Sequence, residues 1–140
     1  MNYRCIYIEL ICQNIYTLLN QKKMSYLQKA DALYQMINSG QLLDAFEKYY
    51  AEDVVMQEIG EAPRVGKAVN REYEEKFVNY LAEVHGGGID NMIADENKGV
   101  VMIENWMDVT FKDGNRVKME QVCVQQWKDE QIVSEKFYHK

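Results

Sequence analysis

The chain has 140 residues, of which 47% are apolar and 27% charged, and its formal charge is −6. This length suits one domain with one buried core, and the composition suggests neither a disordered chain nor a membrane span. The acidic balance and the lack of a Lys/Arg cluster argue against a nucleic-acid partner, because phosphate binding requires concentrated positive charge.

Cysteine and histidine usage argues against a metal site. The three cysteines, Cys5, Cys12 and Cys123, are odd in number and lack CxxC spacing, which disfavours a disulfide framework and a zinc site. This usage fits a reducing compartment and favours a cytoplasmic protein. With two histidines in the whole chain, a multi-histidine metal centre can be set aside, and we expect no metal and no cofactor.

Residues 1–23 differ from the remainder, because isoleucine and leucine alternate there with tyrosine and neither glycine nor proline occurs. Glu9 and Gln13 interrupt the apolar run, which disfavours a secretory signal peptide. Met24 offers a second start, since Ser25 is a good N-cap for the periodic segment that follows. We therefore expect a domain over residues 24–140. Residues 1–23 would be an extension, either from an upstream start codon or as an extra helix laid on the domain.

The first half of the expected domain has a helical pattern. From Ser25 to Asn38, apolar residues recur at three- and four-residue steps, and Gly40 suits the end of that helix. The pattern resumes from Gln41 to Tyr50. A short strand over Val54, Val55 and Met56 leads to Glu58, and Gly60 and Pro63 break it. A third helix is predicted from Lys67 to Glu83, and its inner stripe is Val69, Tyr73, Phe77, Tyr80 and Leu81.

The second half of the chain has an extended pattern after the glycines at 86–88. Turn chemistry typical of antiparallel hairpins separates four predicted strands, at about 84–95, 100–112, 115–128 and 131–139. The order helix, helix, strand, helix and four strands predicts an α+β fold, in which a curved sheet wraps the helices.

This order, together with the runs Ala32–Asp44, Tyr49–Val55 and Arg64–Lys67, resembles the nuclear transport factor 2-like superfamily. More narrowly, the stretch from Ser25 to Tyr138 resembles its SnoaL-like branch. The resemblance implies a cone-shaped, antiparallel or mixed sheet closed by helices around an apolar pocket. This fold hosts isomerases, cyclases, dehydratases and non-catalytic members, so the function must be argued from the site.

Glu58 is the candidate base that this resemblance implies. Members similar to the ketosteroid isomerases carry a carboxylate base at the end of the first strand, where Glu58 stands, and an oxyanion-binding tyrosine close to Tyr34. Cys123 stands near the position of their second acid, and a thiol is a weaker donor. The SnoaL-like cyclases, which use one acid/base residue, are therefore the nearer model. The residues alone leave a second reading of Glu58, a solvated carboxylate or one paired with Arg64.

Further candidates come from the glycine run and the last two strands. His85 precedes the three glycines and is either a weak proton carrier or a surface residue beside a bulge. Strand alternation places one set of side chains inward, where they either line a ligand pocket or serve the structure: Gln121, Cys123, Gln125 and Trp127. Glu135 is also expected inward, as a second acid or as a structural bridge.

We therefore expect a SnoaL-like protein that binds a small, mostly apolar or carbonyl-containing ligand in a cone pocket. If it is catalytic, Glu58 acts as the base of isomerase- or cyclase-type chemistry. The alternative is a non-catalytic ligand-binding or dimerisation module. No nucleic-acid or membrane partner is expected. Val122 and Val124 on the opposite sheet face predict a homodimer formed through the back of the sheet.

Overall fold

A computed structural model describes residues 23–139, and expectations about residues 1–22 lie outside it. The α+β order predicted from the sequence is confirmed. In chain order the elements are α2 (Tyr26–Asn38), α3 (Leu42–Tyr49), β1 (Tyr50–Glu58), β2 (Arg64–Val65), α4 (Lys67–Tyr80), β3 (Leu81–Asp95), β4 (Val100–Phe111), β5 (Arg116–Lys128) and β6 (Gln131–Tyr138). Over residues 23–139, no helix has the length and apolar content needed to cross a membrane.

Three boundaries differ from the sequence-based expectation. The strand β1 begins at Tyr50 rather than near Val54, and the two-residue strand β2 was not expected. The helix α4 ends at Tyr80, not at Glu83, because Leu81 adopts an extended conformation and Glu83 pairs with Thr110 of β4. Pairing with a distant strand thus overrides the local helical pattern at this end.

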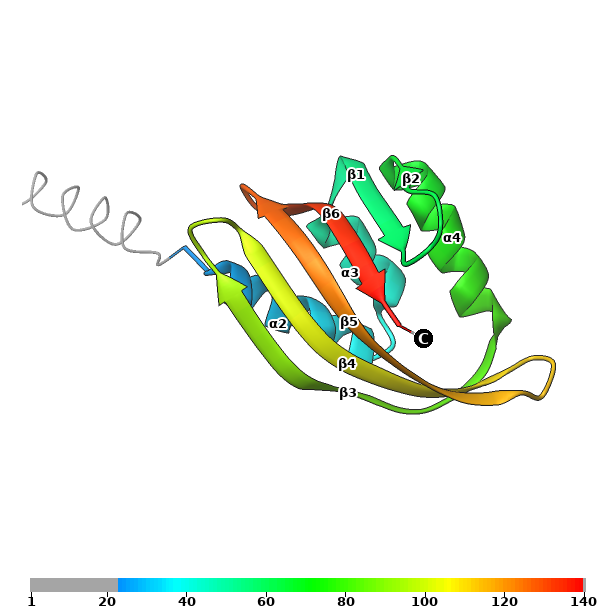
Figure 1. The fold of residues 1–140 in the computed structure, drawn as a ribbon. Helices are drawn as coiled ribbons and strands as arrows, with labels where there is room; N and C mark the ends of the chain where they lie inside the picture. Colours follow the sequence, from blue (N-terminus) through cyan, green and yellow to red (C-terminus); the bar gives the residue numbers. More distant parts are fainter. Residues whose placement is uncertain (1–22, 140) are drawn as a thin grey trace, which may run out of the picture.

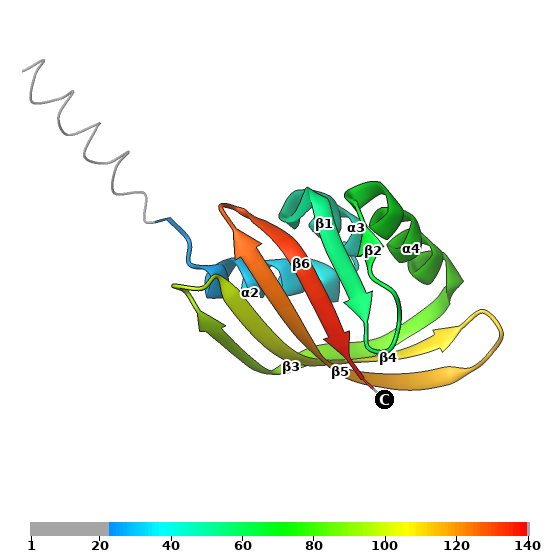
Figure 2. The same cartoon turned by 45° about the horizontal axis from the view of Figure 1, so that its top comes forward.

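The sheet has the strand order β2-β1-β6-β5-β4-β3. The pair β1 and β6 runs parallel, whereas the neighbouring pairs are antiparallel, so the sheet is mixed. Figures 1 and 2 show the helices on one face of this curved sheet, with the β4–β5 hairpin extending past the end of β6. Because β6 ends opposite Val122, the first part of β5 pairs with β4 alone.

Hydrogen bonds attach the start of α2 to the β3–β4 turn of the sheet. Ser25 Oγ accepts a hydrogen bond from Gln28 N at 3.1 Å, and Gln28 Oε1 accepts one from Ser25 N at 3.0 Å. This is the capping box that the sequence pattern indicates. The carboxylate of Glu96 in the β3–β4 turn accepts further bonds from Tyr26 N at 2.9 Å and Leu27 N at 3.0 Å. The first two N–H groups of α2 are therefore held by the β3–β4 turn.

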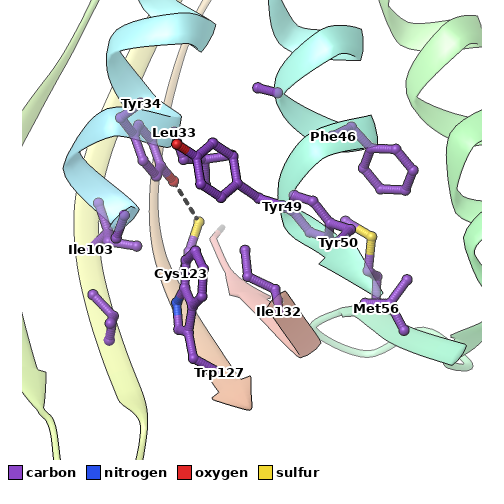
Figure 3. Packing of buried hydrophobic residues seen from close by; sticks show 14 residues of the cluster. Leu33, Tyr34, Phe46, Tyr49, Tyr50, Met56, Ile103, Cys123, Trp127 and Ile132 are labelled. Carbon is purple, nitrogen blue, oxygen red and sulfur yellow. Dashed lines mark hydrogen bonds between the residues drawn. The ribbon is translucent and has the colours of Figure 1, made fainter. Parts of the chain in front are cut away.

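The core lies between α2, α3 and the inner face of the sheet (Figure 3). Aromatic rings dominate its centre: the ring centroids of Phe46 and Tyr50 are 4.6 Å apart, and those of Tyr49 and Trp127 are 6.0 Å apart. Leu33, Val101 and Ile103 are fully buried around them. Tyr50 and Trp127 belong to this core, and their polar atoms also take part in the hydrogen bonds of the site described next. Core packing therefore holds these two side chains in place.

Candidate functional site

The inner face of the sheet and the three helices leave a cavity of about 990 Å³. Its apolar wall includes Ile37, Leu42, Phe46, Met56, Phe77 and Phe137. Its polar wall includes Tyr34, Tyr50, Glu58, Glu74, Gln121 and Glu135. A volume of this size with a mostly apolar lining and a few convergent polar groups is typical of small-molecule sites.

Glu135 of β6 is the most deeply buried acid of the cavity wall, with 1% of its surface exposed. Its Oε2 accepts a hydrogen bond from the Tyr50 hydroxyl at 2.5 Å, and its Oε1 accepts one from Gln125 Nε2 at 2.9 Å. Burial raises the pKa of Glu135 to about 7, although both hydrogen bonds act in the opposite direction. Glu135 can therefore gain or lose a proton near neutral pH.

Gln125 and Trp127 lie behind Glu135 and are not among the residues that line the cavity. Trp127 Nε1 donates to Gln125 Oε1 at 3.0 Å, so the amide of Gln125 must turn its NH2 group toward Glu135. Both side chains point inward, as predicted. Their observed contacts orient the carboxyl group rather than border the cavity.

Glu74 of α4 is a second cavity acid, which the sequence reasoning missed. Burial raises its pKa to about 7, and the nearby charge of Glu135 adds to the effect. The helix turns Lys67, Asn70 and Glu74 inward. Of the predicted inner stripe, Tyr73 and Phe77 also border the cavity, although Tyr73 is 40% exposed, while Val69 is 53% exposed and does not border it. The three- and four-residue spacing of Lys67, Asn70 and Glu74 is the pattern of one helix face and could have indicated Glu74. The surrounding residues are mostly charged, however, which is the pattern of a solvent-exposed face.

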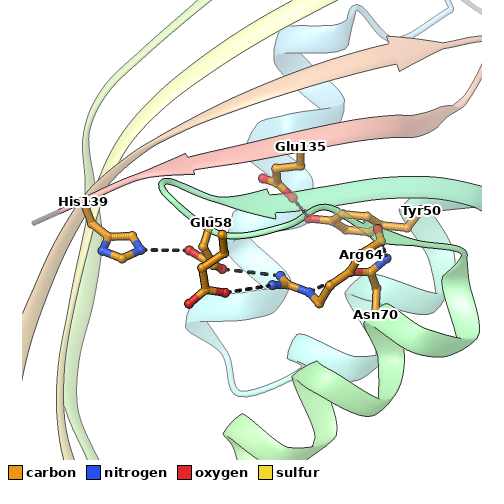
Figure 4. A network of polar contacts seen from close by, with 7 residues as sticks. Tyr50, Glu58, Arg64, Asn70, Glu135 and His139 are labelled. Carbon is orange, nitrogen blue, oxygen red and sulfur yellow. Dashed lines mark hydrogen bonds and ion pairs between the residues drawn. The ribbon is translucent and has the colours of Figure 1, made fainter.

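Glu58 ends β1 at the cavity mouth, with 16% of its side chain exposed. Its Oε1 lies 3.4 Å from Arg64 Nη2 and its Oε2 lies 2.9 Å from His139 Nε2 (Figure 4). Asn70 holds Arg64 in place, since its Oδ1 accepts from Arg64 Nε at 3.1 Å. The pairing with Arg64 that the sequence left open is present, and both carboxylate oxygens have a partner.

Tyr34 belongs to a second polar chain in the cavity wall. Its hydroxyl donates to Cys123 Sγ at 3.4 Å and accepts from Asn105 Nδ2 at 3.2 Å (Figure 3). Gln121 Nε2 donates to Asn105 Oδ1 at 3.3 Å. Burial raises the pKa values of both Tyr34 and Cys123 above their ordinary values. The Tyr34 hydroxyl and the thiol therefore stay neutral, and Gln121 borders the cavity.

His85 is not brought to the cavity wall. Its Nε2 lies 2.7 Å from Thr110 Oγ1, next to an irregular pairing of β3 with β4 between Val84 and Gly86. The glycines leave room for the indole ring of Trp106, because a Cβ atom on Gly88 would lie 3.1 Å from Trp106 Nε1. Within residues 23–139, no three His, Cys, Asp or Glu side chains are grouped to hold a metal ion.

A mixed, curved sheet closed by α2, α3 and α4 over an acid-lined cavity places this chain in the class of nuclear transport factor 2-like α+β proteins. The family model of the SnoaL-like domain matches residues 24–139, and the chain belongs to this family. The family match begins next to Ser25, the N-cap of α2.

Solved structures share this fold. A Mesorhizobium loti protein provisionally assigned as a SnoaL-like polyketide cyclase is 28% identical, with a TM-score of 0.72, over 83% of this chain and 100% of that one. A provisionally assigned isomerase from Bacillus subtilis is 15% identical, with a TM-score of 0.71, over 84% of this chain and 90% of that one. SalBIII, an epoxide hydrolase/cyclase-like enzyme of pyran ring formation in salinomycin, is 21% identical, with a TM-score of 0.69, over 82% and 90%. A search of curated proteins found no match.

Proposed function

We propose that the cavity binds a small, mostly apolar, oxygen-bearing molecule and that Glu135 exchanges a proton with it in isomerase- or cyclase-type chemistry. One observation carries this proposal: a carboxyl group in the cavity wall is 1% exposed and has a pKa of about 7. A general acid or base works best when its pKa lies near the operating pH, because both protonation states are then populated.

The surroundings of Glu135 suit this role. Tyr50 and Gln125 fix the plane of its carboxyl group, and the apolar wall keeps its protonated form favourable. As the acid, Glu135 would donate to a carbonyl or ether oxygen. As the base, it would remove a proton from a carbon next to a carbonyl.

Glu74 completes the acid/base arrangement. A charge on Glu135 raises the pKa of Glu74, so ionisation of one carboxyl favours the neutral form of the other. Two carboxyls with opposed protonation states can supply one donor and one acceptor to the same ligand. The cavity wall thus offers an acid and a base without any bound cofactor in the proton transfer.

Glu58, the base predicted from the sequence, is the competing assignment within the same function. Its two oxygens contact the guanidinium of Arg64 and the ring of His139, and its side chain is 16% exposed, whereas Glu135 is 1% exposed. We assign Glu58 to the cavity mouth, where its carboxylate and Arg64 orient each other.

Relatives support the class of chemistry. SalBIII is described as an epoxide hydrolase/cyclase-like enzyme with a role in pyran ring formation, and the Mesorhizobium loti protein is assigned, provisionally, as a polyketide cyclase. The non-catalytic alternative, a ligand-binding module, keeps the same cavity but gives Glu135 a structural role. The two functions differ in whether a bound ketone loses a proton.

Exchange of α-protons in heavy water tests the proposal without knowledge of the natural substrate. Cyclohexanone and 1-indanone would be followed by NMR with the wild-type protein, Glu135→Gln and the matched variant Glu58→Gln. We expect the wild type to accelerate exchange and Glu135→Gln to lose about 100-fold or more of that rate. Glu58→Gln should keep most of it. Loss in Glu58→Gln with an intact Glu135→Gln variant would move the base to Glu58. Binding without exchange in the wild type would support the non-catalytic module.

A further inference from the structure

The back of the sheet, opposite the helices, carries a row of exposed apolar side chains. In the strand register Ile93 lies opposite Met102, and Met102 lies opposite Val124, so the row crosses β3, β4 and β5. Ile93 is 65% exposed and Met102 is 42% exposed. The adjoining pair, Val122 and Tyr138, is 38% and 44% exposed. These five residues are termed the back patch. A continuous apolar surface of this kind is typical of a docking site.

The chain enters the described domain next to this patch. Glu96, which holds the first two N–H groups of α2, lies three residues after Ile93. Lys23 is tied to the same end of the sheet, since its Nζ lies 3.2 Å from Glu130 Oε1 in the β5–β6 turn. Figures 1 and 2 show the start of α2 beside the β3–β4 turn. The described chain therefore begins, at Lys23, beside the edge of the sheet that carries the back patch.

The preceding segment has the length and pattern to cover the patch. A helix of 22 residues would span about 33 Å, whereas three neighbouring strands are only about 10 Å across. Four apolar residues of the segment recur at three- and four-residue steps, so a helical pattern would place them on one face as a stripe: Ile8, Ile11, Ile15 and Leu18. The same pattern would place Ile6 and Leu10 on the opposite face. A stripe of this kind needs an apolar counterpart, and the back patch provides one where the segment ends.

Charge favours this segment over a second copy of the chain. Arg4, Lys22, Lys23 and Glu9 give residues 1–23 a net charge of +2, so the whole-chain charge of −6 leaves −8 on residues 24–140. Two copies packed back to back would bring two surfaces of the same sign together. The segment instead brings positive charge to an acidic domain, at an effective concentration fixed by its covalent attachment.

We propose that residues 1–22 pack against the back patch of their own chain through the stripe of Ile8, Ile11, Ile15 and Leu18. Val122 and Tyr138 of the back patch also border the cavity, but the contact does not rest on the proposed chemistry. The segment lies outside the family match, which begins at residue 24. The homodimer predicted from Val122 and Val124 would place a second copy on the same face and is the competing occupant.

Photo-crosslinking of the full chain tests this contact. A benzoyl-phenylalanine at Ile93 would be illuminated, and the products would be separated by mass and mapped by peptide mass spectrometry. We expect links from position 93 to residues 1–22 in material of single-chain mass, 16.5 kDa. Links in material of twice that mass would overturn the proposal in favour of the dimer. The absence of any link to residues 1–22 would also overturn it.

Matched variants separate specific packing from random collision. Ile11→Asp with Ile15→Asp places two charges in the stripe, and Gln13→Asp with Asn20→Asp places two charges outside it. The first pair should lose the link from position 93, and the second should retain it. The same photo-reactive group at Val69 of α4, a 53% exposed position, should give no link to residues 1–22. Equal linking in both pairs, or from both positions, would contradict a specific contact.

Discussion

The Tyr50 hydroxyl donates a hydrogen bond to Glu135 Oε2 across a separation of 85 residues in the chain. The two side chains meet because β1 and β6 pair in parallel, with Met56 opposite Glu135. Phe46 stacks on the ring of Tyr50 and keeps its hydroxyl directed at the carboxyl group. The parallel pair in an otherwise antiparallel sheet therefore builds the polar centre of the cavity.

Replacement of Glu135 by Gln should flatten the pH dependence of stability. The folded-state pKa of Glu135 is about 7, above its ordinary value of 4.5, so the folded protein holds a proton that the unfolded chain releases. The free energy of unfolding therefore falls as the pH rises from about 4.5 to 7 and is then constant. At 1.36 kcal/mol per pKa unit, Glu135 accounts for about 3 kcal/mol of this fall.

Urea unfolding at pH 5, 6, 7 and 8, followed by circular dichroism, measures this slope. Glu135→Gln should lose about 2–3 kcal/mol less stability than the wild type over that range, because part of the fall already lies below pH 5. Glu120→Gln, a change at an exposed carboxylate, should keep the wild-type slope. Identical slopes in Glu135→Gln and the wild type would mean that Glu135 does not retain its proton in the folded state.

Replacement of Tyr50 by Phe should raise the pKa of Glu135 further. The hydroxyl of Tyr50 stabilises the ionised carboxylate, so its loss favours the protonated form. A hydrogen bond to a charged group contributes about 1.5–3 kcal/mol, which corresponds to an upward shift of about 1–2 pKa units. Carboxyl carbon-13 NMR through a pH titration would measure it. An unchanged or lower midpoint would contradict the assigned donor.

Local pattern was sufficient to predict much of the fold. The N-cap at Ser25 and the hairpin turns at residues 96–99 and 113–115 were sufficient to predict where α2 begins and where β3, β4 and β5 are separated. Strand alternation placed Gln125 and Glu135 inward, because a period of two depends on the strand alone. These patterns depend on residues that are close in sequence. The structures that they predict are present in the fold because no distant contact opposes them.

The missed parts depend on distant contacts. Tyr50 was assigned to the end of a helix, since no local feature reveals that β1 pairs in parallel with β6. Glu74 was overlooked because apolar residues were taken to mark the inner face of α4. A cavity replaces the core beneath part of that helix, so Glu74 borders it together with Tyr73 and Phe77, while Val69 is 53% exposed.

Replacement of Gln125 by Leu should destabilise the fold more than the same change at Gln121. Gln125 is fully buried and satisfies both Trp127 Nε1 and Glu135 Oε1, so Leu would leave two buried polar groups without a partner. Each such group costs about 1–3 kcal/mol. Gln121 borders the cavity, where water can replace its hydrogen bond to Asn105. Thermal unfolding of both variants tests this difference, and equal losses would contradict it.

The Cys123 thiol should be chemically inert in the folded protein. The nucleophile in thiol chemistry is the thiolate, and burial raises the pKa of Cys123 well above its ordinary value. The residue is also fully buried beneath Tyr34. In a Cys5→Ser, Cys12→Ser background, iodoacetamide at pH 8 should leave the native protein unmodified and should alkylate Cys123 completely in guanidinium chloride. Alkylation of the native protein at the rate of a free thiol would show that the core beside Tyr34 opens. The hydrogen bonds that join Tyr34, Cys123 and Asn105 could not then hold this part of the cavity wall in place.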